Sequence, residues 1–239
     1  MFNVNTIQFI ITLITLLLIY LVTVSLAGLT RAWVAKQMGD DGPEEAGFLT
    51  LNPVPHVDPV GLLITFLSYA MEWGLFGVFG WGTYFPIDTD AIHGRLRSVK
   101  VALALFSDTL CHMACAITGL VTIVGIFGEK AVRLTVDHAA LTQQLSHLSS
   151  LTVTVTFIGV VFIYFNIMLA GLSFIINAYR TLMKYLFENH PELFEYHGFL
   201  TFALLLLFIF FFAAPMRLLI VHLILKGASI IAYLLGLGH

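Results

Sequence analysis

Four side chains that could bind a metal or transfer protons lie on one face of a predicted membrane helix. Asp108, Cys111, His112 and Cys115 follow the i, i+3, i+4, i+7 spacing that places residues above one another on a helix. Carboxylate, imidazole and thiolate groups bind zinc, and an Asp–His pair inside a membrane can relay protons. We favour a structural role, in which Asp108 and His112 hydrogen-bond each other or a neighbouring helix and the cysteines pack. Zinc sites usually draw their ligands from more than one element, and polar contacts commonly join membrane helices.

A second polar pair lies in the last apolar segment. His222 and Lys226 are spaced i, i+4, and a lysine at membrane depth needs a neutralising partner. Asp108 is one of the few acids in the apolar segments, so we predict a structural pairing of Lys226 with Asp108. The alternative is a transport or proton-conducting role for Asp108, His112 and Lys226.

The stretch from Gly47 to Gly61 reads GFLTLNPVPHVDPVG and lies between two apolar segments. It holds three of the seven prolines, each of which fixes its own φ and biases the preceding residue toward extended geometry. Irregular backbone at membrane depth survives only where protein or a water-filled cavity covers it. We therefore predict a Pro-rich re-entrant loop folded against the other helices. Its candidate binding residues are Asn52, Pro53, His56, Asp58, Pro59 and Gly61.

His56 and Asp58 within this loop could also be metal ligands. Two ligands rarely make a site, however. Between prolines, short polar side chains commonly fix a turn by bonding to backbone amides, and we predict that role for both residues.

The composition places these residues in a membrane. The chain of 239 residues is 59% hydrophobic and 10% charged, whereas a soluble domain is about 25% charged. The net charge of −3 is small and argues against a nucleic-acid partner. We predict one all-α integral membrane domain over residues 1–239, embedded in the lipid bilayer and without a cofactor.

The apolar runs divide this domain into about five to six helices. The predicted spans lie near 7–29, 101–127, 151–176, 199–214 and 218–237. A glycine-rich element near 62–85 is predicted to be re-entrant or a hairpin, because its glycines weaken any single straight helix. The predicted boundaries are polar or proline-containing stretches at 39–43, 129–150 and 215–217.

Basic residues assign the two sides of the membrane. If the glycine-rich element returns to the side that it left, one side carries Arg31, Lys36, Arg95, Arg97, Lys100, Arg180 and Lys184. The other side carries Lys130, Arg133 and Arg217. The positive-inside rule then predicts that the first set faces the cytoplasm.

The order of several short motifs resembles that of one known family. The motifs are Gly39-Asp40, the loop LTLNP with His56, Asp58, Pro59 and Gly61, Gly80-Trp81 with Pro86, Phe165-Asn166, and Arg180. The same order is found in the compact bacterial branch of the site-2 protease family. The members of this family are intramembrane zinc metalloproteases. The resemblance covers nearly the whole chain, and the loop is its most specific part. It implies a site-2-protease-like transmembrane core in the bacterial inner (cytoplasmic) membrane, with the loop as a substrate-docking or shielding edge.

The resemblance also implies that the catalytic helix has lost its function. In the family, an HExxH sequence holds zinc with two histidines, and the glutamate polarises the metal-bound water. Counted back from Gly39-Asp40, those positions are Ala27, Gly28 and Arg31. The first two have no ligand atoms, and the third is a permanent cation that repels a divalent metal.

Two further catalytic positions depart from the family pattern. The aspartate that supplies the third ligand corresponds to Asn177, an amide that lacks the charge and binds zinc poorly. The substrate-orienting asparagine corresponds to Thr109. Because ligands, base and orienting residue are lost together while the loop remains, we predict a catalytically degenerate homologue, a pseudoprotease with no bound metal.

We predict a non-enzymatic role for this scaffold. It would act as a binding scaffold or an accessory subunit of a membrane complex, with a transmembrane helix of a partner protein as its ligand. One alternative is an active metalloprotease that uses Asp108, His112 and the cysteines as ligands. Stoichiometric zinc in the purified protein that is lost in His112→Ala would support this alternative. The other alternative is a small transporter or proton-conducting subunit. Flux across proteoliposomes that is unchanged in Asp108→Asn would exclude it.

Overall fold

A computed structural model of the chain describes residues 4–70, 80–136, 150–189 and 213–237. The described residues are mostly helical and contain no strand. Three helices among them are long and apolar enough to cross a membrane, namely α1 (Val4–Met38), α4 (Arg97–Val136) and α6 (Ser150–Asn189). Shorter helices are α2 (Gly42–Glu45), the 3₁₀ turn η1 (Val54–His56), α3 (Pro59–Ala70) and α8 (Ala213–Leu234). The predicted all-α membrane fold is confirmed.

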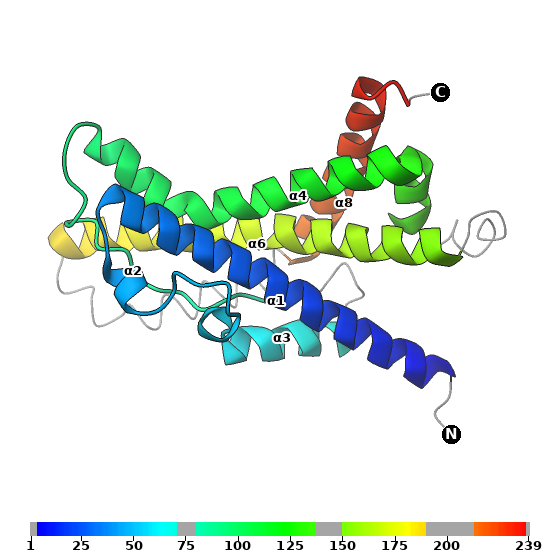
Figure 1. The fold of residues 1–239 in the computed structure, drawn as a ribbon, viewed down its shortest axis with the longest axis horizontal. Helices are drawn as coiled ribbons and strands as arrows, with labels where there is room; N and C mark the ends of the chain where they lie inside the picture. The colour runs from blue at the N-terminus through cyan, green and yellow to red at the C-terminus, as the bar shows by residue number, and fades with distance from the viewer. Residues whose placement is uncertain (1–3, 71–79, 137–149, 190–212, 238–239) are drawn as a thin grey trace.

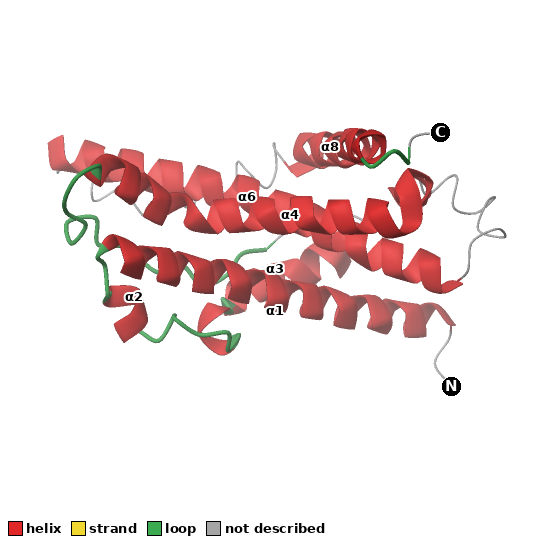
Figure 2. Cartoon of the chain, turned by 45° about the horizontal axis from the view of Figure 1, so that its top comes forward, coloured by secondary structure: helices red, strands yellow, loops and turns green. Residues whose placement is uncertain are grey.

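The three long helices run side by side, and α4 lies at the centre of the packing. It contacts α6 along most of its length, α1 on another side, and α8 near one end. Figure 1 shows α8 crossing this bundle steeply, whereas α3 lies beneath α1. The turned view in Figure 2 shows the same layering of α1, α4 and α8. Side chains of α4 can therefore meet those of α1 and α6 at one point.

Helix α1 ends where the sequence predicted a stop. Gly39 has a φ of 114°, and the amide of Asp40 donates to the carbonyl of Ala35 at 3.0 Å. The Gly39 amide donates to the carbonyl of Lys36 at 3.1 Å, which completes a glycine-dependent helix end. The helix nevertheless continues past the predicted span end at residue 29. Arg31 therefore lies inside the bundle and is only 3% exposed.

The other long helices also exceed their predicted spans. Helix α4 kinks at Gly128, where φ is 79°, and residues 129–136 are helical although a polar loop was predicted there. Helix α6 runs beyond residue 176 to Asn189. Helix α8 covers Ala213–Leu234 in the described residues, so the predicted break at 215–217 lies within a helix. The predicted span at 199–214 lies outside the described residues, except for its last two.

The glycine-rich element joins a short helix to a non-helical segment. Helix α3 covers its first part, residues 71–79 lie outside the described residues, and Gly80–Asp88 has no helical structure. A Cβ added at Gly61 would meet the Trp81 carbonyl oxygen at 2.0 Å, so α3 and this segment pack backbone against backbone. Tyr20 of α1 donates its hydroxyl to the same carbonyl at 2.8 Å. These contacts fix the 80–88 segment along α1, as the irregular backbone of a membrane protein requires.

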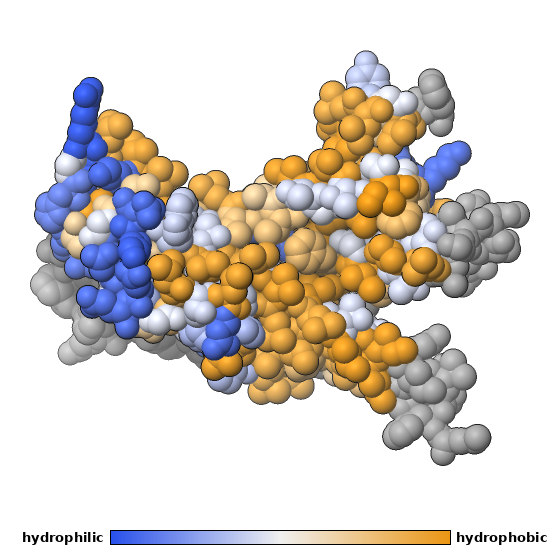
Figure 3. Space-filling view, viewed as in Figure 1, coloured by the Kyte–Doolittle hydropathy of each residue, from blue (hydrophilic) through white to orange (hydrophobic). Residues whose placement is uncertain are grey.

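Polar surface gathers at one end of the molecule. Figure 3 shows hydrophilic residues at the end where α1 stops and α4 begins, and mainly apolar surface along the rest of this face. Ion pairs at this end join Lys36 to Glu44, and both Arg97 and Lys184 to Asp90. Lys36, Arg97 and Lys184 thus share one end of the bundle, in agreement with the grouping predicted from the sequence. That this end faces the cytoplasm stays a prediction.

Candidate functional site

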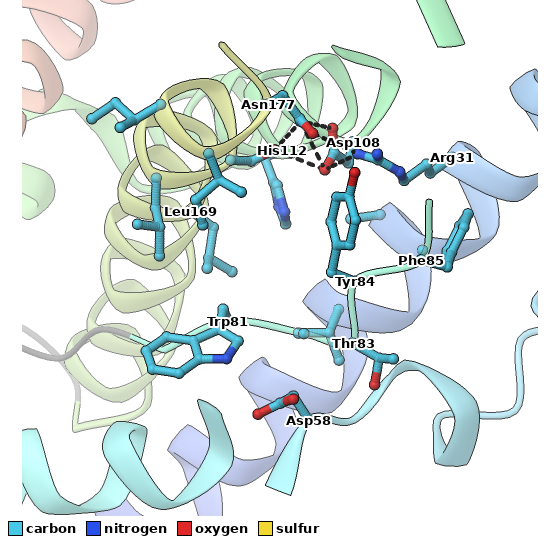
Figure 4. A pocket seen from close by; sticks show the side chains of 18 of the residues that line it. Arg31, Asp58, Trp81, Thr83, Tyr84, Phe85, Asp108, His112, Leu169 and Asn177 are labelled. Carbon is cyan, nitrogen blue, oxygen red and sulfur yellow. Dashed lines mark hydrogen bonds and ion pairs between the residues drawn. The ribbon is translucent and has the colours of Figure 1, made fainter. Parts of the chain in front are cut away.

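A cavity of about 430 Å³ lies between α1, α4, α6 and the non-helical segment. Figure 4 shows the segment with Trp81, Thr83 and Tyr84 along one side and the helices along the others. The cavity has a polar end and an apolar wall. The polar end is lined by Arg31, Tyr84, Asp108, Ser173, Asn177 and Arg180. Apolar side chains of the wall include Val24, Leu169, Leu172, Ile175 and Ile176.

Arg31 holds the polar end together. Its Nη1 atom donates to Asp108 Oδ2 at 2.9 Å, to Asn177 Oδ1 at 3.1 Å and to the Leu105 carbonyl at 3.2 Å. These acceptors belong to α4 and α6, so one nitrogen of α1 joins the three long helices. A buried ion pair offsets its desolvation only when further hydrogen bonds satisfy both partners.

Asp108 has those further bonds. Its carboxylate accepts the Ser173 hydroxyl at 2.7 Å, the Asn177 side-chain amide at 3.1 Å and the backbone amide of Thr109 at 2.8 Å. The hydroxyls of Thr109 and Ser173 bond each other at 2.9 Å. The carboxylate is therefore occupied from α1, α4 and α6 at once, and we call Arg31, Asp108, Thr109, Ser173 and Asn177 the Arg31 cluster.

His112 lies one turn further along α4 and forms a separate contact. Its Nδ1 atom lies 3.2 Å from Asn166 Oδ1, while Asn166 Nδ2 donates to the Phe162 carbonyl at 2.9 Å and to Thr23 Oγ1 at 3.3 Å. Because the Asn166 nitrogen is a donor, its oxygen accepts from His112 Nδ1–H, and this network assigns Nε2 as the acceptor. Figure 4 shows the imidazole pointing into the cavity.

The face of α4 that the sequence singled out is thus a helix–helix contact. The preferred interpretation is confirmed for Asp108 and His112, which bond neighbouring helices rather than each other. Cys111 accepts a hydrogen bond from Thr30 Oγ1 of α1 at 3.3 Å, and Cys111 and Cys115 are free thiols. In the part of the chain that the structure describes, no three His, Cys, Asp or Glu side chains are grouped as a metal site would need.

The pairing of Asp108 with Lys226 is wrong. The cation beside Asp108 is Arg31, because α1 packs along α4 at that level. Helix α8 instead contacts the other end of α4, where the Ser229 hydroxyl donates to Glu129 at 2.9 Å. His222 and Lys226 are exposed on α8, away from the cavity lining.

The Pro-rich loop is folded against the helices, and its polar side chains bond its own backbone. Asp58 Oδ1 accepts the Gly61 amide at 2.7 Å, which caps α3 with Pro59 at its first position. Asn52 Oδ1 accepts the Val54 amide at 3.1 Å. The predicted turn-fixing role is confirmed for Asp58.

His56 differs from this prediction. Its Nε2 bonds the Thr50 carbonyl at 2.8 Å, not an amide, and the side chain is only 1% exposed. The ring lies over Gly28 of α1, where an added Cβ would fall 2.2 Å from His56 Nδ1. The loop therefore fills the space beside Gly28, one of the positions that the resemblance aligns with the HExxH sequence. Gly28 is required by this close approach.

Tyr84 and Arg180 form a contact that the sequence did not predict. The guanidinium of Arg180 lies 3.2 Å from the centre of the Tyr84 ring, and that of Arg31 lies 4.8 Å from it. Arg180 was recognised only as a motif residue. No spacing could pair it with Tyr84, because the contact joins the non-helical segment to α6.

The residues at this point do not fit the zinc ion that an HExxH site would hold. Ala27 and Gly28 offer no donor atoms, and Arg31 places a permanent positive charge where the ion would sit. Asn177 Oδ1 and the Asp108 carboxylate are both used by Arg31. His112 Nε2 remains as a single ligand, and structural or catalytic zinc needs at least three from the protein.

Comparisons with known proteins give one partial match. Over 90 residues, the chain is 32% identical to a Bacillus subtilis (strain 168) protein named "Putative zinc metalloprotease YwhC". The match spans 37% of this chain and 37% of the relative's length. It agrees with the resemblance to a family of zinc metalloproteases. No family model and no solved structure matches the chain.

Proposed function

We propose that this chain is a non-catalytic, site-2-protease-like protein of the bacterial inner membrane. It acts as a binding scaffold or accessory subunit of a membrane complex and recognises a transmembrane helix of its partner. The observation that carries this proposal is the Arg31 cluster, in which a guanidinium is bonded to Asp108 and Asn177 at the meeting point of three helices.

The convergence of the degenerate positions supports the proposal. In an active family member, the ligands from the HExxH helix and from the later LDG motif must meet at one ion. Arg31 and Asn177, which stand at two of these positions, lie 3.1 Å apart across α1 and α6. The two positions therefore meet across the helices, and a covalently attached cation lies where they meet.

A guanidinium replaces only part of what a metal ion does. It neutralises Asp108 and joins three helices, so it supplies cohesion. It has no open coordination position, and it cannot lower the pKa of a bound water as zinc does. The cluster thus suits a protein whose selected property is a stable helical framework.

The alternative hypothesis, an active metalloprotease with zinc ligands other than those of HExxH, has less support. It needs Asp108, His112 and the cysteines to converge on one ion. Asp108 faces Arg31, His112 Nδ1 faces Asn166, and Cys111 faces Thr30. Each side chain is thus directed to a different partner. We therefore prefer a binding function to a hydrolytic one.

The test combines metal analysis and a cleavage assay with co-purification. The full-length protein is purified in nanodiscs, and its zinc content and its cleavage of a transmembrane peptide are measured. Proteins that co-purify with the chain from native membranes are identified by mass spectrometry. We expect no stoichiometric zinc, no cleavage, and one stoichiometric co-purified membrane protein. Zinc that is lost in His112→Ala, or cleavage that is lost in Asp108→Asn, would overturn the proposal in favour of an enzyme.

A further inference from the structure

The polar end of the cavity has more hydrogen-bond donors than acceptors. Arg31 uses Nη1, but its Nε and Nη2 are buried without a hydrogen-bond partner. Arg180 makes no hydrogen bond or ion pair with any residue that the structure describes. Both guanidinium groups line the cavity. A buried donor without an acceptor costs free energy, so this end favours a ligand that brings acceptors.

The charges at this end lead to the same conclusion. Asp108 neutralises Arg31. The other acid in the lining, Asp58, caps α3, and Figure 4 shows it at the opposite side of the cavity. Arg180 is therefore a half-buried cation without a nearby carboxylate among the described lining residues. An unpaired charge away from water is costly, and an anion would relieve that cost.

The Tyr84 ring contacts both cations. Its ring lies 3.2 Å from the Arg180 guanidinium and 4.8 Å from that of Arg31. The face of an aromatic ring is its negative pole and attracts cations, but more weakly than an oxyanion does. The ring thus fills a position that suits an anion, and its hydroxyl adds one more donor there.

The rest of the cavity is apolar and small. Leu169, Leu172 and Ile176 of α6, with Val24 of α1, form its wall. A cavity of about 430 Å³ lies in the range that holds small molecules. A helix of about 10 Å diameter fills roughly 400 Å³ in each turn, so a cavity of this size suits a small ligand better than a transmembrane helix. An alkyl chain fits its size and its lining.

We propose that this cavity binds a single-chain anionic amphiphile. Its carboxylate or phosphate head accepts hydrogen bonds from Arg31, Arg180 and the Tyr84 hydroxyl, and takes the place of the Tyr84 ring beside the two guanidinium groups. Its alkyl chain lies along the apolar wall of α6. This ligand site goes beyond the scaffold function, which concerns a protein partner outside the cavity.

Equilibrium binding to the full-length protein in phosphatidylcholine nanodiscs tests the site. The probes are palmitate and hexadecyl phosphate, with hexadecanol as the uncharged control of equal chain and inorganic phosphate as the control without a chain. We expect either anionic amphiphile to bind at one per protein, and both controls to bind at least about tenfold more weakly, as the loss of a charge-assisted bond requires. The ratio of the two affinities identifies the head group.

Matched variants locate the binding. Arg180→Gln removes a cation of the cavity, and Lys226→Gln removes an exposed cation of α8 with the same change in net charge. Ile176→Trp fills the apolar wall and leaves both arginines in place. We expect Arg180→Gln and Ile176→Trp each to weaken binding by about tenfold or more, and Lys226→Gln to leave it within about twofold.

Three results would overturn the inference. They are equal binding of palmitate and hexadecanol, equal effects of Arg180→Gln and Lys226→Gln, and a peptide segment of a partner found in the cavity by crosslinking from Leu172. Failure of the amphiphile to bind would leave the scaffold proposal intact, since that proposal is tested by zinc content, cleavage and co-purification.

Discussion

Helix α4 carries two similar polar clusters that differ in burial. At one level, Asp108 accepts from Arg31 and from the Ser173 hydroxyl of α6. Near the other end, Glu129 accepts from Arg133 and from the Ser229 hydroxyl of α8. In both clusters, a carboxylate of α4 is joined by an arginine and by a serine of a neighbouring helix.

The two clusters differ in what surrounds them. The Arg31 side chain is 3% exposed and that of Asp108 18% exposed, whereas Arg133 is 52% and Glu129 23% exposed. Exposed ion pairs contribute little because water screens them, but a buried charge that loses its partner is strongly destabilising. The same chemistry is therefore expected to be structural at Asp108 and nearly neutral at Glu129.

The largest effect is expected for Arg31→Met. This change leaves the part-buried Asp108 carboxylate without its cation, and we expect the free energy of unfolding to fall by about 3 to 5 kcal/mol. The measurement is equilibrium denaturation of the purified protein in mixed micelles. The double variant Arg31→Met with Asp108→Leu removes both charges and should recover most of the loss. A single variant as stable as the original protein would show that the cluster does not hold the helices together.

A smaller effect is expected for Asn177→Asp, which places an aspartate at the position that the resemblance aligns with the third zinc ligand of site-2 proteases. The new carboxylate can still accept from Arg31, but it loses the amide donor that bonds Asp108 at 3.1 Å and places two like charges together. We expect a loss of about 1 to 3 kcal/mol in stability. We also expect no zinc to remain after dialysis, because Arg31 still occupies the centre. Stoichiometric zinc in this variant, measured by mass spectrometry, would contradict our account of the degenerate site.

A third contact, between Gly28 of α1 and the buried His56 ring, involves no ion pair. In Gly28→Ala, the added methyl would fall 2.2 Å from His56 Nδ1, so the ring must move and its bond to the Thr50 carbonyl must weaken. Overpacking of this kind costs about 1 to 3 kcal/mol. The same change in a His56→Ala background should cost far less, because the colliding ring is gone. Equal costs in the two backgrounds, measured by thermal unfolding, would place the strain elsewhere.

The parts of the fold that the sequence predicted depend on local contacts. The stop at Gly39 and the cap by Asp58 each join residues within one turn of each other, so turn and cap chemistry sufficed. The spans followed from apolar length, but their ends did not. Helices α1 and α6 continue past residues 29 and 176, and Arg31 and Asn177 bond each other between these helices instead of ending them in water.

The candidate site was predicted only in part for the same physical reason. Arg31 and Asn177 were identified through the family motif, and they do converge. Lys226 was predicted as the partner of Asp108 because both residues lie in apolar segments. The positions of charged residues in a sequence do not show which helices pack side by side. The contact of Tyr84 with Arg180 depends on where the non-helical segment runs, which no periodicity specifies. The sequence thus predicted contacts between neighbouring residues, but it did not predict which side chains of different helices meet.

The smallest effect is expected for Arg133→Gln in the exposed cluster of α4. The side chain donates to Glu129 and, at 2.8 Å, to the Ser229 hydroxyl, but it is half in solvent, and Ser229 keeps its own bond to Glu129. We expect stability to change by less than about 1 kcal/mol, and this small change to shrink further as salt is raised. Equilibrium denaturation at low and high ionic strength, alongside Arg31→Met, measures both clusters under the same conditions. If Arg133→Gln destabilised the protein as much as Arg31→Met, burial could not be what separates the two clusters, since both variants remove one arginine from a carboxylate of the same helix.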